Sequence, residues 1–326
     1  MERFRIGIIG AGHIAEKMSR TIAAMENAEA YAVASRDAAK AAAFAETFGF
    51  TKSYGSYEEL ADDPLVQLIY VATPHSFHHA HVRMCIEKGK PVLCEKAFML
   101  NRKQAEDVID LARRSKVFLA EAIWTRYLPS RREIASIIES GAIGKPHLLT
   151  ANLGYPVAHK ERVIRPELGG GSLLDLGVYC INFAMMHFGD DIEKTVSTCI
   201  KSPEGMDFTD SIVFHYADGR MATMLTTVSC IDDRQGIIRG DEGYLVVDNV
   251  GHPLRIDIYD RMHSLVESRE IEEKITGFEY QVQECIDTIL AGGIEPASMP
   301  HSETLKVMGI MDSLREEWGV RFPGED

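Results

Sequence analysis

A glycine-containing turn near the start of the chain has the residue types that a phosphate-binding loop needs. Residues 10–15 read Gly-Ala-Gly-His-Ile-Ala, directly after the apolar run Phe4–Ile9 and at the start of a helical pattern. Gly10 permits a tight turn, Gly12 lets the backbone approach a pyrophosphate, and Ala15 allows close contact between helix and strand. The helix N-terminus adds unpaired N–H groups and a positive dipole end. A turn that serves packing alone is the alternative. The pattern predicts a dinucleotide site formed by Gly10, Gly12, His13, Ile14 and Ala15.

The end of the next expected strand bears on which dinucleotide binds. Residues 34–37 read Ala-Ser-Arg-Asp. An NAD site usually has a carboxylate here, which accepts hydrogen bonds from the ribose hydroxyls. The hydroxyl of Ser35 and the guanidinium of Arg36 suit a 2′-phosphate instead, which a carboxylate would repel. The sequence therefore favours NADP. Two alternatives stay open: Arg36 is a solvated loop residue, or Asp37 holds the ribose of NAD.

A lysine follows another expected strand, Pro91–Cys94. Glu95 and Lys96 lie at the carboxyl end of that strand, where ligands bind in open α/β sheets. The ammonium group of Lys96 can donate hydrogen bonds to a nicotinamide ribose and a substrate oxygen, and it can stabilise a developing alkoxide. The alternatives are a surface lysine and a Glu95 that is only its structural partner.

An aspartate and a tyrosine four residues apart form a second group with catalytic potential. On a helix, Asp175 and Tyr179 share one face. Gly177 between them costs about 1 kcal/mol relative to alanine, which indicates close approach of another group. A tyrosine near an ammonium loses its proton more easily, and it can then remove a hydroxyl proton while hydride leaves the same carbon. The alternative is a half-buried Tyr179 with Asp175 as a helix cap.

Over residues 1–122, short apolar runs alternate with helical patterns. The expected strands are Phe4–Ile9, Ala30–Ala34, Leu68–Ala72, Pro91–Cys94 and Val117–Glu121. The expected helices are His13–Glu26, Ala38–Phe48, a short one capped by Ser56 and Glu59, His78–Lys88, and one capped by Asn101 and Gln104 that ends at Ser115. This alternation predicts an α/β domain built on a doubly wound parallel sheet.

Residues 123–326 follow a different pattern. The expected strands are His147–Leu153, Thr195–Ile200, Ser211–His215, Met221–Cys230, Tyr244–Val247 and Arg255–Ile258, with hairpin connections at residues 217–219 and 240–243. The expected helices are Ser130–Ser140, Ser172–Phe188, Gly277–Leu290 and Ser302–Trp318. The pattern predicts an α+β second domain with a large, mostly antiparallel sheet, and a cleft between the two domains is the natural place for a ligand.

Composition excludes several classes of partner. The 326 residues contain 35 Lys and Arg against 49 Asp and Glu, so the formal charge is 35 − 49 = −14. Such a surface repels phosphate backbones and anionic lipid, so we expect no nucleic-acid or membrane partner. The apolar stretches are strand-sized and interrupted by charges, so no bilayer-spanning helix is expected. The six cysteines include no CxxC pair, and the N-terminus has no signal-peptide pattern, which favours reduced thiols and a cytoplasmic location.

Four histidines between positions 75 and 81 raise the question of a metal site. Zinc needs convergent ligands, usually with carboxylate or thiolate help. On the expected helix these imidazoles point around more than one face. The cluster also begins just after a strand end, where cofactor contacts are expected. We therefore expect no metal site.

Together, the motifs resemble the glucose-fructose oxidoreductase/inositol dehydrogenase (Gfo/Idh/MocA) family over nearly the whole chain. The match rests on the Gly10–Ala15 turn, Thr73-Pro74 with His78, Glu95-Lys96 and the helix from Asp175 to Tyr179. The segments CEK (94–96), EAIWTRY (121–127) and GGGSLLDLGVYC (169–180) look like the dimeric dihydrodiol dehydrogenase branch, which is similar to NADP-dependent D-xylose dehydrogenases. One departure is Ala97, where the family usually has proline.

The resemblance implies a Rossmann domain followed by a domain with an open antiparallel sheet, which often pairs two subunits. It implies Lys96 and Tyr179 as catalytic residues. Arg36 matches the branch's NADP preference. Around the cofactor it implies Thr73, Pro74, His75, His78 and Glu95, and as candidate pocket residues Trp124, Arg126 and Phe278, for which inter-domain packing is the alternative.

The sequence thus predicts a cytoplasmic, homodimeric NADP-dependent oxidoreductase that interconverts a secondary alcohol, on a trans-dihydrodiol or a sugar, and its carbonyl. In oxidation Tyr179 takes the hydroxyl proton, Lys96 stabilises the oxyanion, and Asp175 orients the substrate or the tyrosine. Two alternatives stay open: an NAD-dependent sugar or inositol dehydrogenase, and a non-catalytic dinucleotide-sensing regulatory protein.

Overall fold

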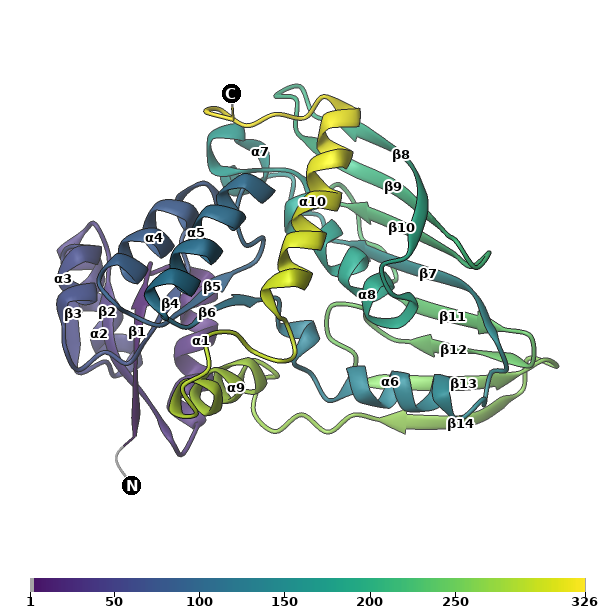
Figure 1. The fold of residues 1–326 in the computed structure, drawn as a ribbon, viewed down its shortest axis with the longest axis horizontal. Coiled ribbons are helices and arrows are strands. Elements are labelled where there is room, and N and C mark those ends of the chain that lie inside the picture. Colours follow the sequence, from purple (N-terminus) through teal and green to yellow (C-terminus); the bar gives the residue numbers. More distant parts are fainter. Residues whose placement is uncertain (1–2, 326) are drawn as a thin grey trace. The chain divides into compact units, whose positions relative to one another are not determined.

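The computed structural model describes residues 3–325, which form two compact units (Figure 1). Unit 1 runs to Trp124 and also takes in Lys274–Gly309, whereas unit 2 comprises Thr125–Glu273 and the residues from Ile310 on. The sequence-based division is a single cut after residue 122, so the structure differs from it in the segment Lys274–Gly309. This segment belongs to unit 1 because Phe278, Val282, Cys285 and Ile286 are buried in the core of that unit.

Unit 1 is built on a parallel sheet, as predicted. Within the described residues its six strands lie in the order β3-β2-β1-β4-β5-β6. Their bounds are β1 Phe4–Ile9, β2 Ala28–Ala34, β3 Lys52–Tyr54, β4 Leu68–Val71, β5 Val92–Glu95 and β6 Leu119–Ala122. The order reverses between β1 and β4, which is where ligands bind in sheets of this kind. Strand β3 was not predicted, because it is three residues long and its first two residues are exposed.

The helices of unit 1 begin where the sequence signals place them. They are α1 His13–Ala24, α2 Ala38–Phe48, α3 Tyr57–Asp62, α4 His78–Glu87, α5 Arg102–Ser115, α9 Glu279–Leu290 and the first half of α10 His301–Trp318, with the short 3₁₀ turn η1 His75–Phe77. A second 3₁₀ turn, η2 Trp124–Arg126, begins at the last residue of this part of unit 1 and continues into unit 2. The hydroxyl of Ser56 accepts a hydrogen bond from the Glu59 N–H at 3.1 Å, and Asn101 accepts one from Gln104 at 2.9 Å. Both predicted caps are therefore confirmed.

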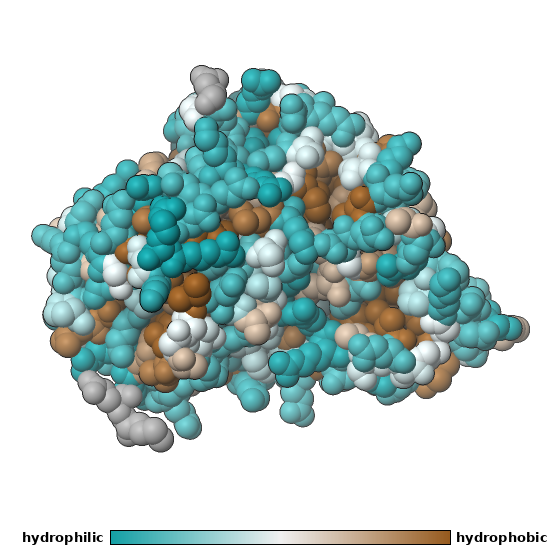
Figure 2. Space-filling model, in the orientation of Figure 1, coloured by the Kyte–Doolittle hydropathy of each residue, from teal (hydrophilic) through white to brown (hydrophobic). Residues whose placement is uncertain are grey.

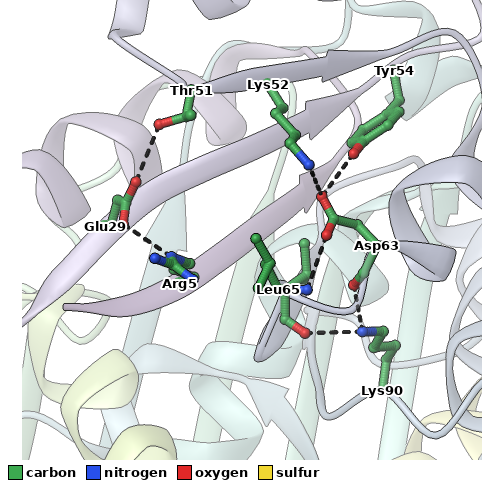
Figure 3. A network of polar contacts seen from close by, with 9 residues as sticks. Arg5, Glu29, Thr51, Lys52, Tyr54, Asp63, Leu65 and Lys90 are labelled. Atoms are coloured by element: carbon green, nitrogen blue, oxygen red, sulfur yellow. Dashed lines mark hydrogen bonds and ion pairs between the residues drawn. The ribbon is translucent and has the colours of Figure 1, made fainter. Parts of the chain in front are cut away.

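A buried carboxylate holds the edge of this sheet in place (Figure 3). The Asp63 side chain accepts hydrogen bonds from Lys52 Nζ at 2.9 Å, Tyr54 Oη at 2.7 Å and the Leu65 N–H at 2.9 Å. Lys90 Nζ donates to the Asp63 carbonyl oxygen at 2.6 Å. Burial alone would raise the pKa of Asp63, but the hydrogen bonds from Lys52, Tyr54 and Leu65 lower it to about 2. The group therefore ties β3 to the α3–β4 loop.

Unit 2 contains the predicted, mostly antiparallel sheet. Over the described part of the chain its eight strands lie in the order β14-β13-β12-β11-β7-β10-β9-β8, and only the β7–β10 pair is parallel. Their bounds are β7 Pro146–Gly154, β8 Ile192–Lys201, β9 Asp207–Tyr216, β10 Met221–Thr227, β11 Gly236–Gly240, β12 Gly243–Val247, β13 Arg255–Asp260 and β14 Leu265–Glu270. The expected hairpin connections at 217–219 and 240–243 join β9 to β10 and β11 to β12. Strands β11 and β14 were missed, because one is framed by glycines and the other is an exposed, charged edge.

One face of this second sheet is covered and the other is open. Ala222 and Met224 of β10 are buried on the face against which helix α8 Val178–Phe188 packs. On the opposite face several large apolar side chains are exposed. They are Leu148 (40% exposed), Val196 (46%), Ile200 (68%) and Leu225 (40%). The remaining helices of unit 2 are α6 Ser130–Glu139, α7 Glu161–Ile164, the 3₁₀ turn η3 Pro166–Leu168 and the second half of α10.

The helix predicted over Ser172–Phe188 is not a regular α-helix throughout. Its first turn, η4 Leu173–Gly177, is π-helical and leads into α8. A Cβ on residue 177 would lie 2.9 Å from Leu173 Cδ1, which is too close for an unshifted contact, so glycine suits this π-helical turn. The close neighbour of Gly177 is thus a side chain of its own turn, whereas Thr226 Oγ1 of β10 would lie 3.7 Å away, an ordinary contact distance, so the expected close approach of another group stays a prediction. The assumption of regular α-helical spacing between Asp175 and Tyr179 was wrong.

A second correction concerns membrane spans. The stretch Pro166–Phe188 is long and apolar enough to cross a membrane by length and composition, so the expectation that no segment reaches this limit was wrong. However, 89% of its apolar window is buried within the protein, as in the core helix of a folded domain. Hydrophilic residues cover most of the face drawn in Figure 2, in line with the excess of carboxylates.

Candidate functional site

The two glycines of the predicted phosphate turn have different structural requirements. Gly10 has a φ of +105°, and a Cβ there would lie 2.8 Å from the Ala72 carbonyl oxygen, so the fold itself requires glycine. Gly12 has an extended backbone at the N-cap of α1, and a Cβ there would meet nothing within 4 Å. Packing does not explain Gly12, so open space beside a helix N-terminus is available for a phosphate group. Ala15 is fully buried, Ile14 is half-buried and His13 is exposed.

At the end of β2, the carboxylate and the guanidinium have separate roles. The Asp37 side chain is the N-cap of α2 and accepts hydrogen bonds from the N–H groups of Ala39 and Lys40, at 3.0 and 3.1 Å. Ser35 is buried, and its hydroxyl accepts a hydrogen bond from the Asp37 N–H at 3.2 Å. Arg36 is exposed, with its Cζ 5.5 Å from the centre of the Phe77 ring. The carboxylate is thus engaged in its own helix, while the cation lies at the surface.

A buried histidine joins the two loops that follow β4 and β5. His78 is fully buried, and its Nε2 lies 2.7 Å from the Thr73 carbonyl oxygen. Its Nδ1 lies 3.0 Å from the Ala97 oxygen and 3.1 Å from the Phe98 oxygen. Burial lowers the pKa of His78, and the nearby Lys96 charge acts in the same direction. Because its ring is enclosed, His78 acts on a cofactor only through the loops that carry Thr73 and Lys96.

Glu95 is also a structural partner within this loop. Its side chain is buried and accepts hydrogen bonds from the hydroxyl of Tyr70 on β4 and from the backbone N–H of Lys96. The Lys96 side chain is half-buried, and the Lys96–Ala97 peptide bond is cis. The carboxyl end of β5 is therefore held on one side by Tyr70 and on the other by His78, with Lys96 between the two contacts.

The remaining histidines point in different directions, as the helix pattern indicated. His79 Nε2 lies 2.8 Å from Asp107 of α5, whereas His81 Nδ1 lies 3.1 Å from Thr73 Oγ1. Burial is the main reason that the pKa of His81 falls to about 4. His75 is half-buried and packs edge-on to His78, next to the exposed Pro74. Within residues 3–325, no three His, Cys, Asp or Glu side chains converge as a metal site.

In unit 2, Asp175 is paired with a cation that the sequence reading did not identify. Its carboxylate lies 2.8 Å from Arg162 of α7, and only 8% of the Asp175 side chain is exposed. Tyr179 follows in the first turn of α8 and is half-buried. Asp175 is thus an ion-paired group rather than a simple helix cap. No sequence signal marks Arg162, because it lies 13 residues away, by 175 − 162, on a separate short helix.

The three candidate pocket residues fall into two groups. Trp124 and Phe278 stack within unit 1, with ring centres 4.3 Å apart and planes 6° from parallel. Arg126 belongs to unit 2, where its Nε donates to Asn182 Oδ1 of α8 at 2.7 Å and only 3% of the residue is exposed. The structure therefore brings Trp124 and Phe278 together and assigns Arg126 to the support of the helix that carries Tyr179.

The family models that match this chain cover most of both units. Residues 4–122 match a model described as "Oxidoreductase family, NAD-binding Rossmann fold", and residues 131–246 match one described as "GFO/IDH/MocA C-terminal domain". The predicted family and both fold classes are therefore confirmed.

Two relatives and one solved structure illustrate the similarity. Trans-1,2-dihydrobenzene-1,2-diol dehydrogenase from Xenopus laevis is 33% identical and aligns with 97% of this chain and 98% of its own. The protein of the same name from Homo sapiens is 29% identical, with 98% of each chain covered. A 3-ketoreductase from Actinomadura kijaniata, solved in complex with NADP and TDP-benzene, superimposes with a TM-score of 0.89 at 24% identity, over 97% of this chain and 98% of its own. At that identity the structural match shows the fold.

Proposed function

The chain belongs to the Gfo/Idh/MocA oxidoreductase family, and from this premise we propose that it is an NADP-dependent dehydrogenase acting on a secondary alcohol. That it is a dinucleotide-dependent oxidoreductase follows from the family. The choice of NADP, the substrate and the acid–base residues are the parts that we propose. The relatives named trans-1,2-dihydrobenzene-1,2-diol dehydrogenase make a trans-dihydrodiol the first substrate to test, with sugars next.

The observation that carries the choice of NADP is the end of β2. The carboxylate of Asp37 caps α2 and accepts hydrogen bonds from two backbone N–H groups, which stabilise its present position. The exposed Arg36 guanidinium supplies the charge that a 2′-phosphate needs. Asp37 would have to hold the ribose of NAD while its Oδ1 caps α2, or give up a cap worth about 1 kcal/mol. The 3-ketoreductase was solved with NADP, which agrees with this choice.

The residues present fit a bound dinucleotide. The open space at Gly12 and the N-terminus of α1 suit a pyrophosphate, and Thr73, Pro74 and His75 lie on the loop after β4, beside the point where the strand order reverses. When bound, NADP supplies the hydride acceptor for oxidation, and NADPH supplies the donor for reduction.

The chain itself supplies the proton chemistry. In oxidation the Tyr179 hydroxyl oxygen, as phenolate, removes the proton of the substrate hydroxyl while the hydride leaves the same carbon, and a C=O bond forms. The Lys96 ammonium stabilises the developing oxyanion and favours the phenolate form of the tyrosine. Asp175, held by Arg162, orients the tyrosine or a second substrate hydroxyl. The stacked Trp124 and Phe278 offer an apolar wall for the ring of a dihydrodiol.

Two substitutions test the assignment. Tyr179→Phe removes only the proton-transferring oxygen, and Lys96→Met removes only the charge. We expect each to lower kcat by about 10²- to 10⁴-fold with the NADP dissociation constant changed by less than about tenfold. The assay follows NADPH absorbance with trans-dihydrodiols, pentoses, hexoses and inositols, each with NADP and with NAD.

Each alternative predicts a different result in this assay. An NAD-dependent sugar or inositol dehydrogenase gives higher kcat/KM with NAD. A dinucleotide-sensing protein without chemistry binds NADP but turns over nothing in the panel. Near-normal kcat in both variants would refute the roles of Tyr179 and Lys96.

We also propose that the protein is a homodimer formed through the open face of the second sheet. Val196 and Ile200 of β8, Leu225 of β10 and Leu148 of β7 expose large apolar side chains on that face. Strand residues that face water are usually polar, so an apolar set of this kind favours a protein partner.

A further inference from the structure

Two aspartates of β9 face the interior of unit 2, although strand residues three apart normally face opposite sides. The pairing of β8 with β9 is shifted between Ile200, which pairs with Thr209, and Lys201, which pairs with Asp207. Phe208 is therefore the extra residue of a β-bulge. The bulge turns Asp207 to the same face as Asp210, and their exposures are 1% and 0%.

Asp207 contacts the backbone at the beginning of the π-helical turn η4. Its Oδ2 accepts a hydrogen bond from the Leu173 N–H at 2.6 Å. A Cβ on Gly171 would lie 2.3 Å from Asp207 Oδ1, so the carboxylate packs directly against the backbone there. This contact explains a glycine at position 171, which also has a φ of +107°. Asp207 therefore holds the first residue of the turn that leads to Asp175 and Tyr179.

Asp210 holds the same segment through two hydroxyl groups. Thr226 Oγ1 donates to Asp210 Oδ2 at 2.9 Å, and Ser172 Oγ donates to Thr226 Oγ1 at 3.1 Å. The other oxygen, Asp210 Oδ1, is buried and has no hydrogen-bond donor among the described residues. A buried carboxylate oxygen without a donor is costly if the group is ionised. A proton on this oxygen removes that cost, because it can be donated to the neighbouring Asp207.

The charged and titratable groups around the pair do not neutralise two negative charges. Arg315 of α10 lowers the pKa of Asp207, but its guanidinium also lies 2.7 Å from Glu325 and 3.0 Å from Asp312. Asp210 acts electrostatically on Cys180 of α8, and both aspartates act on Cys199 of β8; burial is the main reason that the pKa of each thiol is raised, so both thiols are neutral. Arg315 thus divides its charge among three carboxylates, Asp207, Asp312 and Glu325, and the main charge acting on Asp210 is that of Asp207.

The electrostatics agree with this geometry. Burial raises the pKa of Asp207, against the opposing effect of the Leu173 N–H. Burial and the charge of Asp207 raise the pKa of Asp210 well above its usual value. Two carboxyl groups that cannot both ionise hold one proton between them.

We propose that Asp207 and Asp210 share a single proton and position the turn Leu173–Gly177, and through it Asp175 and Tyr179. The shared proton is a property of the folded chain alone. The consequence for turnover rests on the proposed function, because it requires Tyr179 to act on the substrate. Both aspartates are positioning residues, since they contact the backbone and hydroxyl groups of unit 2.

Infrared spectroscopy tests the shared proton without any substrate. At neutral pH the wild-type protein should show a protonated-carboxyl C=O band that Asp210→Asn lacks, because the amide mimics the protonated acid and donates to Asp207. The control is Asp218→Asn, which changes an exposed aspartate that pairs with Arg220. A wild-type spectrum that equals that of Asp210→Asn at this band overturns the proposal.

The pH dependence of stability gives an independent reading. Folding raises the pKa of such a carboxyl group, so the unfolded chain loses the proton at a lower pH than the folded protein does. The free energy of unfolding therefore falls as pH rises from the unfolded pKa to the folded pKa. Asp210→Asn removes this dependence, so the denaturation midpoint of the variant should rise relative to that of the wild type as pH rises from about 4 toward the folded pKa. A constant difference between the two proteins overturns the proposal.

Hydrogen exchange tests the positioning role. Asp207→Ala should speed exchange of the Leu173 amide by about tenfold or more, whereas Asp210→Asn should leave it unchanged.

In the turnover assay, Asp207→Ala should lower kcat by roughly 10- to 100-fold with KM for NADP unchanged, and Asp210→Asn should retain activity. If Asp207→Ala does not fold, the near-isosteric Thr226→Val, which cuts the link from Asp210 to Ser172, takes its place.

The outcomes separate the two proposals. Faster exchange with unchanged kcat in Asp207→Ala overturns the positioning role. Wild-type protein that shows the carboxyl band and the exchange pattern but no turnover supports the shared proton and refutes the proposed function instead.

Discussion

At the scale of single residues, Gly10 and Gly12 separate folding from binding within one motif. Gly10 is required by its positive φ and by the nearby Ala72 carbonyl oxygen, whereas a side chain at Gly12 would extend into open space. A motif of this kind is usually read as a unit. Of these two glycines, Gly12 is the one without a packing reason to be glycine, so it carries the expectation of a bound pyrophosphate.

Serine at each of these positions provides a matched pair of variants. Gly12→Ser places a favoured N-cap residue on α1, so the free energy of unfolding should change by less than about 0.5 kcal/mol. The NADP dissociation constant should rise by about tenfold or more, because the side chain occupies the phosphate space. Gly10→Ser should lose about 1–3 kcal/mol of stability from backbone strain. Thermal unfolding and calorimetric titration measure both quantities, and unchanged NADP affinity in Gly12→Ser would contradict the site.

Arg36 decides the cofactor preference in our proposal. Arg36→Ala should raise KM for NADP by roughly 10- to 100-fold, the effect of losing a charge-assisted hydrogen bond to a phosphate, and should change KM for NAD little. The control is Lys40→Ala, an exposed cation on α2. Equal effects of Arg36→Ala on both cofactors would show that no 2′-phosphate contact exists.

At the scale of elements, the Asp63 network explains how a three-residue strand holds its place. Among the described residues, strand β3 pairs with β2 alone, and two of its three residues, Lys52 and Tyr54, hydrogen-bond to the Asp63 carboxylate (Figure 3). Only 5% of the surface of Asp63 is exposed, so water competes little for these hydrogen bonds. The edge strand is thus attached through side chains as well as through its ladder.

The pH dependence of stability follows from the lowered pKa of Asp63. Folding lowers it from 3.8 to about 2, so its contribution is fully present above the unfolded value and is lost as pH falls toward the folded one. Asp63→Asn should destabilise the protein by about 2 kcal/mol at neutral pH, and the difference from wild type should shrink as pH falls from about 4 to about 2. Urea midpoints across this range measure the effect.

A neighbouring aspartate is the control for this experiment. The Asp62 side chain is 63% exposed and pairs with Lys88 at the surface. Asp62→Asn should therefore change stability by less than about 0.5 kcal/mol at every pH. A pH-independent loss in Asp63→Asn would assign its role to hydrogen bonding without charge.

At the scale of the whole molecule, the chain combines a net charge of −14 with an apolar sheet face. Charge repulsion keeps acidic proteins apart in solution, so pairing of two copies needs a local surface that excludes water. In the proposed dimer, the exposed side chains of Leu148, Val196, Ile200 and Leu225 would form this surface. The strand pairing places all four on the same face of the sheet.

Sedimentation velocity tests the proposed dimer. Ile200→Glu places a charge on the apolar face and should raise the dimer dissociation constant by about 100-fold or more, as for a buried unpaired charge. Leu290→Glu, at an exposed apolar residue of α9 in unit 1, should leave it unchanged. A wild-type protein that sediments as a monomer at micromolar concentration would end the proposal.

The sequence by itself determined the features that depend on neighbouring residues. The β1–turn–α1 unit, the caps at Ser56 and Asn101 and the alternation of unit 1 all follow from contacts within a few positions, and the structure confirms them. The family also follows from such local motifs. These features can be predicted from the sequence because the interacting groups are close together along the chain.

Only the tertiary structure decided which distant segments meet. In the folded protein His78 lies between two loops that follow strands, and residues 274–309 belong to unit 1. Asp175 pairs with Arg162, and a β-bulge brings Asp207 and Asp210 to one face of β9. None of these has a pattern along the sequence, because each depends on how strands pair and how helices pack across long chain separations. The electrostatic environment of a carboxylate is set by those contacts, so it too becomes visible only in the folded protein.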